Sequence, residues 1–279
     1  MSEVSAEELM AITASRLLAD HKVVFAGVGM PLLASAVARR TRAPHLTIVL
    51  EGGIIGTSLL PGKLPVSTNE MRAAYGAQML TDITDIFLYA QRGYFDYGFL
   101  GAAQVDMYGN INTSVIGSIE RPRVRLPGSG GANDIISLCN EVLIVTQHEP
   151  RRFVERVDFI TSPGYLSGGD SRARAGLACG RLGAVVTDLA LLDFEPASRR
   201  MRLRGLQPGV TVGQVREQTG FDLLVGDDIE ALAPPSAEEL AIYRELRDGP
   251  VAAGAESPGA AKPAADAGQR TDRVPAGPA

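Results

Sequence analysis

The chain of 279 residues contains no tryptophan, and aromatic residues make up only 5% of it. This composition argues against a site that binds sugars by stacking them on aromatic rings. Cysteine is scarce as well: Cys139 and Cys179 lie far apart without CxxC spacing, which predicts reduced core thiols in a cytoplasmic protein. His21, His45 and His148 show neither metal-ligand spacing nor a paired nucleophile, so we expect no metal site.

Long hydrophobic runs and excess positive charge are also missing. The uncharged apolar runs are far too short to cross a bilayer, and residues 1–8 are acidic, unlike a secretory signal. A formal net charge of −5 gives no reason to expect nucleic acid as a partner. From Gly249 onward alanine, proline and glycine dominate, which predicts a folded domain over residues 1–248 and a disordered tail over 249–279. The expected ligand is therefore small and intracellular.

The hydrophobic pattern alternates between strand and helix periods, which is typical of an α/β protein. A capping box at Ser5–Glu8 opens a helix, and residues 22–26, 31–40 and 46–50 read as strand, helix and strand, so this pair of strands should be parallel. We predict an open, mostly parallel sheet flanked by helices. The further expected elements are helices over 69–80, 82–91, 135–139 and 211–219, strands over 97–103 and 142–146, and a small antiparallel addition over 184–187, 189–194 and 200–204.

The most informative position is Glu51, which follows the apolar run 46–50 and precedes Gly52 and Gly53. A parallel strand buried on both faces reads as such a run, and ligands of open α/β folds bind beyond the carboxyl ends of these strands. Neighbouring glycines let the backbone adopt a positive φ and let a ligand approach closely. Glu51 is therefore a candidate nucleophile, base or hydroxyl-binding group; the alternative is a buried acid that caps or pairs.

A glycine turn, Gly27-Val28-Gly29, follows the first predicted strand and invites a dinucleotide-binding interpretation. The fingerprint is incomplete, because Pro31 and Leu32 occupy its later positions. The alternative is a tight turn between strand and helix.

A second glycine-rich loop opens a predicted helix and consists of Gly128, Ser129, Gly130, Gly131, Ala132 and Asn133. Consecutive backbone N–H groups at such a place can hold a phosphate or the oxyanion of an acyl-transfer intermediate. The alternative is that these glycines only permit close packing of the helix on the sheet.

Two polar groups accompany these loops. The first lies in a predicted turn and consists of Gln104, Asp106, Asn110 and Asn112. We expect these side chains to form structural hydrogen bonds; contact with the substrate is the alternative. The second is a basic cluster that alternates as a strand face would and can meet the phosphates of a ligand, a partner subunit or solvent: Arg121, Arg123 and Arg125.

Five ordered stretches, 27–31, 51–56, 100–112, 128–135 and 208–212, carry a family resemblance over residues 5–225. With these motifs the chain resembles the β subunit of a two-subunit family I coenzyme A-transferase, and most of all the glutaconate CoA-transferase type. The resemblance implies an open α/β subunit that pairs with a related α subunit. It also implies small carboxylic acids and acyl-CoA as substrates, with no permanently bound cofactor.

By the same resemblance, Glu51 falls on the glutamate that forms a covalent thioester with CoA in a ping-pong exchange. The candidate oxyanion- and CoA-binding positions are Gly27, Gly29, Gly52, Gly53, Gly128, Gly130, Gly131, Ala132 and Asn133. Many relatives have serine or asparagine where this chain has Gly52, which puts a side-chain hydrogen bond beside the nucleophile in doubt.

Two other functions compete with CoA transfer. A thioester or ring-opening hydrolase of the same fold, of the kind found in steroid catabolism, resembles this chain but lacks the glutamate, so the retained Glu51 favours transfer. A non-catalytic sugar-phosphate sensor is the second rival. No DNA-binding segment precedes residue 20, which counts against it.

Overall fold

The N-terminal part of the chain folds as the predicted βαβ unit. The computed structural model of the chain describes residues 4–177 and 179–250. Strand β1 (Val23–Phe25) leads into helix α2 (Met30–Thr41), which returns to strand β2 (Thr47–Leu50). The two strands pair in parallel, as predicted, with Val24 opposite Ile48. Pro31 stands in the first turn of α2, where its missing N–H removes no helical hydrogen bond.

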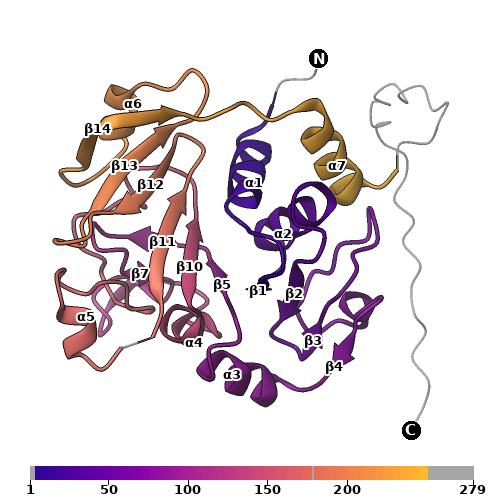
Figure 1. The fold of residues 1–279 in the computed structure, drawn as a ribbon. Coiled ribbons are helices and arrows are strands. Elements are labelled where there is room, and N and C mark those ends of the chain that lie inside the picture. Colours follow the sequence, from indigo (N-terminus) through magenta and orange to yellow (C-terminus); the bar gives the residue numbers. More distant parts are fainter. Residues whose placement is uncertain (1–3, 178, 251–279) are drawn as a thin grey trace, which may run out of the picture.

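In the described residues a single ten-stranded sheet runs in the order β14-β13-β12-β11-β10-β5-β1-β2-β3-β4 (Figure 1). Its centre, from β11 to β2, is parallel, whereas β12 and β13 on one side and β3 and β4 on the other pair antiparallel. The remaining bounds are β3 Ile54–Ile55, β4 Met79–Leu80, β5 Tyr97–Leu100, β10 Glu141–Val145, β11 Arg181–Val186, β12 Ala190–Phe194, β13 Met201–Leu206 and β14 Leu224–Ala231.

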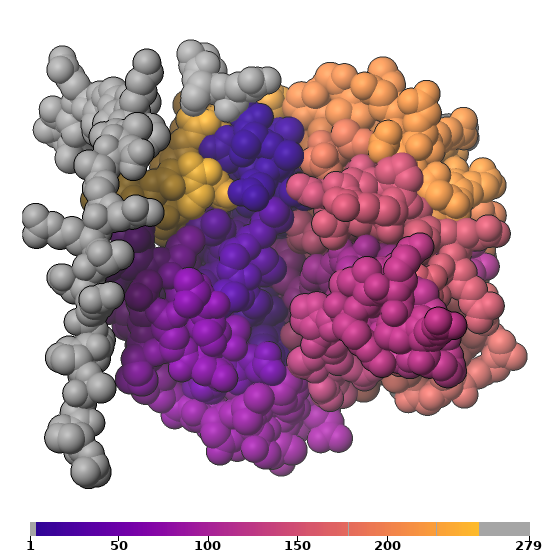
Figure 2. Space-filling view, turned by 180° about the vertical axis from the view of Figure 1, so that it is seen from behind, coloured from indigo at the N-terminus to yellow at the C-terminus, as the bar shows by residue number. Residues whose placement is uncertain are grey.

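Helices cover both faces of this sheet and divide the core in two. Helix α1 (Ala6–Arg16) packs with α2 and with the C-terminal helix α7 (Ala237–Asp248) on one face, where Ile48 and Leu50 point. Figure 2 shows α1, in indigo, beside α7, in yellow. Helices α3 (Ile83–Gln91) and α4 (Ala132–Leu138) cover the other face, where Val49 points. The smaller elements are η1 Met71–Ala74, α5 Ser171–Arg174, α6 Val212–Glu217 and two hairpins, β6 Gln104–Val105 with β7 Ile111–Asn112 and β8 Val115–Gly117 with β9 Pro122–Arg125.

The helix predicted over 69–80 is wrong. Only the short 3₁₀ turn η1 forms there, and strand β4 follows it. Gly76 adopts a φ of +62°, which a right-handed helix does not allow, and the Gln78 N–H bonds the carbonyl of Ile55 on β3. The large apolar side chains of this segment are exposed: Met71, Tyr75, Met79 and Leu80.

The antiparallel addition is confirmed, because β12 pairs antiparallel with both β11 and β13. Strand β11 begins earlier than predicted, at Arg181, and its other edge pairs in parallel with β10. Strand β14 and helix α7 were not predicted. Of the predicted tail, Gly249 and Pro250 lie within the described chain and the rest lies outside it. Within residues 4–177 and 179–250, no helix combines the length and hydropathy needed to cross a bilayer.

Candidate active site

Glu51 directly follows strand β2 and lies at the carboxyl end of the parallel sheet. Side chains alternate along a strand, so Glu51 points to the same face as Val49, toward α3 and α4. There it meets the start of α4: a Cβ built on Gly131, the N-cap of that helix, would lie 3.2 Å from the Glu51 Oε1 atom and 2.8 Å from the ring of Phe87. The structure therefore brings Gly131 to the candidate nucleophile, as the predicted site requires.

The Glu51 side chain has neither a hydrogen bond nor an ion pair to another residue of the described chain. Partial burial raises the pKa of this carboxyl above its usual range, and the negative charge of nearby Asp134 raises it further. A structural acid that caps or pairs would show a lowered pKa and a partner. In the described chain Glu51 thus makes none of the contacts that a capping or paired acid would make.

The two glycines after Glu51 are needed by packing. A Cβ on Gly52 would lie 2.4 Å from both the Asn69 Oδ1 atom and the Thr68 carbonyl oxygen. Gly53 has a φ of +93°, and its Cβ would meet the Thr81 carbonyl oxygen at 2.1 Å. These contacts explain why no serine or asparagine stands at position 52: the Asn69 side chain fills that space.

Four of the predicted loop glycines face open space instead. A Cβ on Gly27, Gly29, Gly128 or Gly130 would meet no atom within 4 Å. Gly29, Gly128 and Gly130 also have positive φ values, so glycine is favoured there on conformational grounds as well. The turn at Gly27 lies beside β2, because the Ala26 N–H bonds the carbonyl of Val49. Open backbone at the carboxyl end of the sheet is where a ligand can approach.

Fewer of the loop N–H groups are free to act as oxyanion donors than the sequence suggested. The N–H groups of Gly128 and Ala132 bond the carbonyls of Thr113 and Ser129, at 2.8 and 2.9 Å, and the N–H of Asn133 bonds the Ser129 hydroxyl at 3.2 Å. Internal bonds thus occupy these three N–H groups. Within the described chain, the N–H groups of Gly27, Gly29, Gly130 and Gly131 make no such bond and remain as candidate donors.

A cavity of about 550 Å³ lies between α3 and α4. Ile83, Phe87, Leu88 and Leu138 line it together with Asp134, whose charge raises the pKa of Glu51. Part of its wall is apolar and exposed, since Ile83 and Leu88 are each more than two-fifths exposed.

The polar turn has the structural role that we expected. The Asn110 Nδ2 atom donates to the Asp106 carboxylate at 2.9 Å, and the Asn112 Nδ2 atom donates to Gln104 Oε1 at 2.7 Å. All four side chains of this turn are buried. The basic cluster is exposed on and beside β9, and Arg123 lines a cavity of about 630 Å³ with Arg151 and Arg152.

The remaining cysteine and histidine predictions are partly confirmed. Cys139 is a buried core thiol whose pKa burial raises to about 12, but Cys179 is exposed, because it follows the short α5 turn rather than a core element. His148 is buried against Phe153 and bonded to the hydroxyls of Thr187 and Thr219, and burial lowers its pKa to about 4. It is an ordinary core histidine.

One cluster was not predicted. Asp20, His21 and His45 come together at the opposite end of the sheet from Glu51, and the Asp20 carboxylate accepts from the His45 backbone N–H and lies 2.9 Å from its Nδ1. The imidazole rings of His21 and His45 stack. Their ligand atoms lie close enough together to hold a metal ion. Spacing in the sequence carries no signal for this cluster, since two separate connections contribute to it.

Fold and site together define an α/β protein with an unpaired carboxylate beside open backbone loops. The coenzyme A transferase family matches residues 7–218, and the chain belongs to that family. It is 41% identical to the B subunit of the 3-oxoadipate CoA-transferase of Pseudomonas knackmussii, over 88% of this chain and 94% of that protein. It is 36% identical to the B subunit of the glutaconate CoA-transferase of Acidaminococcus fermentans, over 87% and 92% of the two chains.

Solved structures agree with these relatives. The glutaconate coenzyme A-transferase from Acidaminococcus fermentans superposes with a TM-score of 0.81 and 33% identity, covering 88% of this chain and 95% of that one. The decarboxylase AibA/AibB superposes with a TM-score of 0.74 and 26% identity, over the same shares of the two chains. The predicted family and fold class are thus confirmed. Membership favours CoA transfer over dinucleotide binding and over a sugar-phosphate sensor.

Proposed function

We propose that this chain is the subunit of a CoA-transferase that carries the nucleophile, and that Glu51 is that nucleophile. The observation that carries the proposal is the unpaired Glu51 carboxylate, with a raised pKa, at the carboxyl end of β2 and against Gly131. Carboxylates attack thioesters poorly in water, because they are well solvated. Partial burial removes part of that solvation, and a fixed position supplies proximity.

The chemistry is a two-stage exchange through a glutamyl-CoA thioester. The Glu51 carboxylate attacks the acyl-CoA carbonyl and expels the CoA thiolate, leaving a mixed anhydride. The thiolate then attacks the glutamyl carbonyl and releases the donor acid as its carboxylate. An acceptor carboxylate reverses both steps, so that a new acyl-CoA leaves and Glu51 is regenerated. Each attack places negative charge on a carbonyl oxygen.

Backbone donors near Glu51 stabilise these oxyanions in our proposal. Gly131 contacts the Glu51 side chain, and the N–H groups of Gly130 and Gly131 have no acceptor in the described chain. Gly27 and Gly29 supply a second set from the neighbouring β1 loop. Loss of one oxyanion donor typically raises a barrier by about 3–4 kcal/mol.

We infer that the acids exchanged are dicarboxylic. The two most similar relatives described above are named for 3-oxoadipate and glutaconate, which both carry two carboxyl groups. These relatives are also named as B subunits, so we propose an α subunit as partner. Exposed apolar side chains support a partner interface: Val66 and Met71 are 83% and 82% exposed. We expect the isolated chain to be inactive, and robust transfer by it alone would contradict the pairing.

The test is direct detection of the covalent intermediate. The complex, incubated with acyl-CoA and no acceptor, should carry CoA on the peptide that contains Glu51, as measured by mass spectrometry. Borohydride should reduce this thioester and inactivate the enzyme, whereas an acceptor acid should discharge it. A Glu120→Gln variant, changed at an exposed acid, is the matched control and should form the adduct normally.

A hydrolase is the rival that a negative result would support. The chain is 26% identical to the cholesterol ring-cleaving hydrolase IpdB subunit of Rhodococcus jostii. If Glu51→Gln keeps its acyl-CoA turnover and no adduct forms, the catalytic group lies elsewhere and the transferase mechanism through Glu51 is wrong.

A further inference from the structure

Arg39, in the last turn of α2, has no acidic side chain as its partner in the described chain. Its one hydrogen bond runs from Nη1 to the carbonyl of Thr57, at 2.5 Å. The guanidinium is partly buried, and burial alone accounts for the lowering of its pKa. Its neighbour Arg40 is exposed and forms a two-pronged ion pair with Glu245, at 3.0 Å. Arg39 is thus a desolvated cation whose charge nothing nearby balances.

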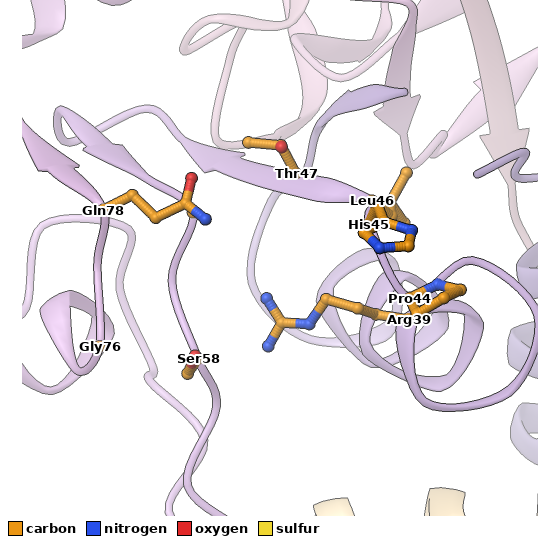
Figure 3. Close-up of a pocket in the computed structure, with 9 residues that line it drawn as sticks. Arg39, Pro44, His45, Leu46, Thr47, Ser58, Gly76 and Gln78 are labelled. Carbon is orange, nitrogen blue, oxygen red and sulfur yellow. The ribbon is translucent and has the colours of Figure 1, made fainter. Parts of the chain in front are cut away.

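The Arg39 side chain points into a cavity of about 510 Å³ (Figure 3). The figure shows its guanidinium extending from the helix toward Ser58 and Gln78, with Thr47 above and His45 at the rim. No aspartate or glutamate lines this cavity; the full lining is Arg39, Pro44, His45, Leu46, Thr47, Gly56, Ser58, Gly76 and Gln78.

The other polar side chains of the cavity are free to donate. The hydroxyls of Thr47 and Ser58 and the amide of Gln78 form no hydrogen bond with another described residue. His45, one of the lining residues, contacts the carboxylate of Asp20 through its backbone N–H and its ring. The cavity therefore offers one positive charge and several neutral donors, with no acceptor of comparable strength.

Two glycines make room for these donors. Gly56 and Gly76 adopt positive φ values of +72° and +62°. A Cβ on Gly56 would collide with the Gln78 side chain at 2.7 Å, and one on Gly76 would approach the Ser58 Cβ at 2.9 Å. Both glycines are thus required for Ser58 and Gln78 to stand beside the cavity.

We propose that this cavity binds a small oxyanion, the phosphate or carboxylate group of a free metabolite. Arg39 supplies the charge, and Ser58 and Gln78 supply neutral hydrogen bonds. A desolvated charge without a partner is unfavourable, and charge-assisted hydrogen bonds to an oxyanion replace the hydrogen bonds to water that burial removed. The site is separate from Glu51, because the four residue steps along the chain from Thr47 to Glu51 span about 13 Å. It does not depend on the proposed nucleophile.

Inorganic phosphate is the probe, titrated into the complex of the full chain with its partner subunit at constant ionic strength. Phosphate at ten times its dissociation constant should raise the melting temperature by about 3–6 °C. Arg39→Gln should lose this shift, whereas Arg40→Gln, the adjacent arginine, should keep it. Gln78→Ala changes an exposed side chain and should weaken phosphate binding by about tenfold, as measured by calorimetry.

Three outcomes would overturn the proposal. One is the absence of any phosphate response in the wild-type complex. Another is an undiminished response in Arg39→Gln, or in Gln78→Ala if the arginine variant does not fold. The third is a response of the isolated chain that disappears in the complex, which would show that a partner side chain fills the cavity instead of a free oxyanion.

Discussion

Glu8, on the face of the sheet that α1 and α7 cover, has an ion-pair partner, whereas Glu51 and Arg39, at the two ends of β2, have none in the described chain. Glu8 on α1 is 3% exposed and pairs with Arg244 on α7 at 2.6 Å, which holds the pKa of Glu8 at about 2. Glu51 beyond one end of β2 and Arg39 beside the other have no such partner, and burial shifts each toward its neutral form. Buried charges without partners are costly and concentrate at functional sites, so the contrast supports our proposals for Glu51 and Arg39.

The largest effect should follow from removing the unpaired acid. Glu51→Gln keeps the size of the side chain but cannot form the thioester, so CoA transfer by the complex should fall on the order of 10⁴-fold or more. Glu51→Asp should fall by about a hundredfold, because a shorter side chain moves the carboxylate roughly 1 Å from its attack position. Steady-state transfer assays measure both. Near wild-type transfer rates in these variants would show that Glu51 is not the nucleophile.

The paired acid should show the opposite pattern, a loss of stability with no loss of catalytic chemistry. Glu8→Gln should lower the free energy of unfolding at pH 7 by about 2 kcal/mol, less than the full pKa shift because Arg244 is partly exposed.

The pH dependence of this loss has a definite sign. The pKa of Glu8 is lower in the folded state than its ordinary value of 4.5, so its contribution is complete above that value. It disappears as the pH falls toward about 2. Denaturant unfolding of wild type and Glu8→Gln should therefore converge at acidic pH; an equal difference at every pH would show that the pair does not account for the loss.

Replacing Glu51 should have the reverse effect on stability. Its folded-state pKa is raised, so the wild type loses stability as the pH rises through that pKa, and the neutral glutamine does not. Glu51→Gln should melt about 1–2 °C higher than wild type at neutral pH, with the difference vanishing in acid. A lower melting temperature at neutral pH would reveal a stabilising partner for Glu51.

The sequence predicts the position of Glu51 directly after a parallel strand, because the signal for that position is local. A continuous apolar run that ends in an acid and two glycines defines a buried parallel strand and its carboxyl end. The contact with Gly131 depends on the return of the chain through α4, and the occupation of the Gly128, Ala132 and Asn133 N–H groups depends on how that loop closes on Thr113 and Ser129. No local pattern reports these distant contacts.

Other features are invisible in the sequence for similar reasons. The helix predicted over 69–80 is wrong because one glycine, Gly76, takes a positive φ and the segment pairs with β3. Whether Arg39 has an acidic partner depends on which side chains the fold places around it. Asp20 and His45 come together from two separate connections. Such facts come from tertiary packing alone.

The smallest effect should come from the exposed acid beside Glu51. Asp134 raises the pKa of Glu51 less than burial does, so Asp134→Asn should lower that pKa only part of the way to its ordinary value. The nucleophile acts when ionised, so transfer declines as the pH falls through this pKa. The acidic limb of the kcat profile should thus move to lower pH in Asp134→Asn, with little change in the plateau. Glu238→Gln, at an exposed acid of α7 on the opposite face of the sheet, is the control and should leave the limb in place. A limb that stays unmoved in Asp134→Asn would mean that another group governs it, and that the raised pKa of Glu51 does not set the rate.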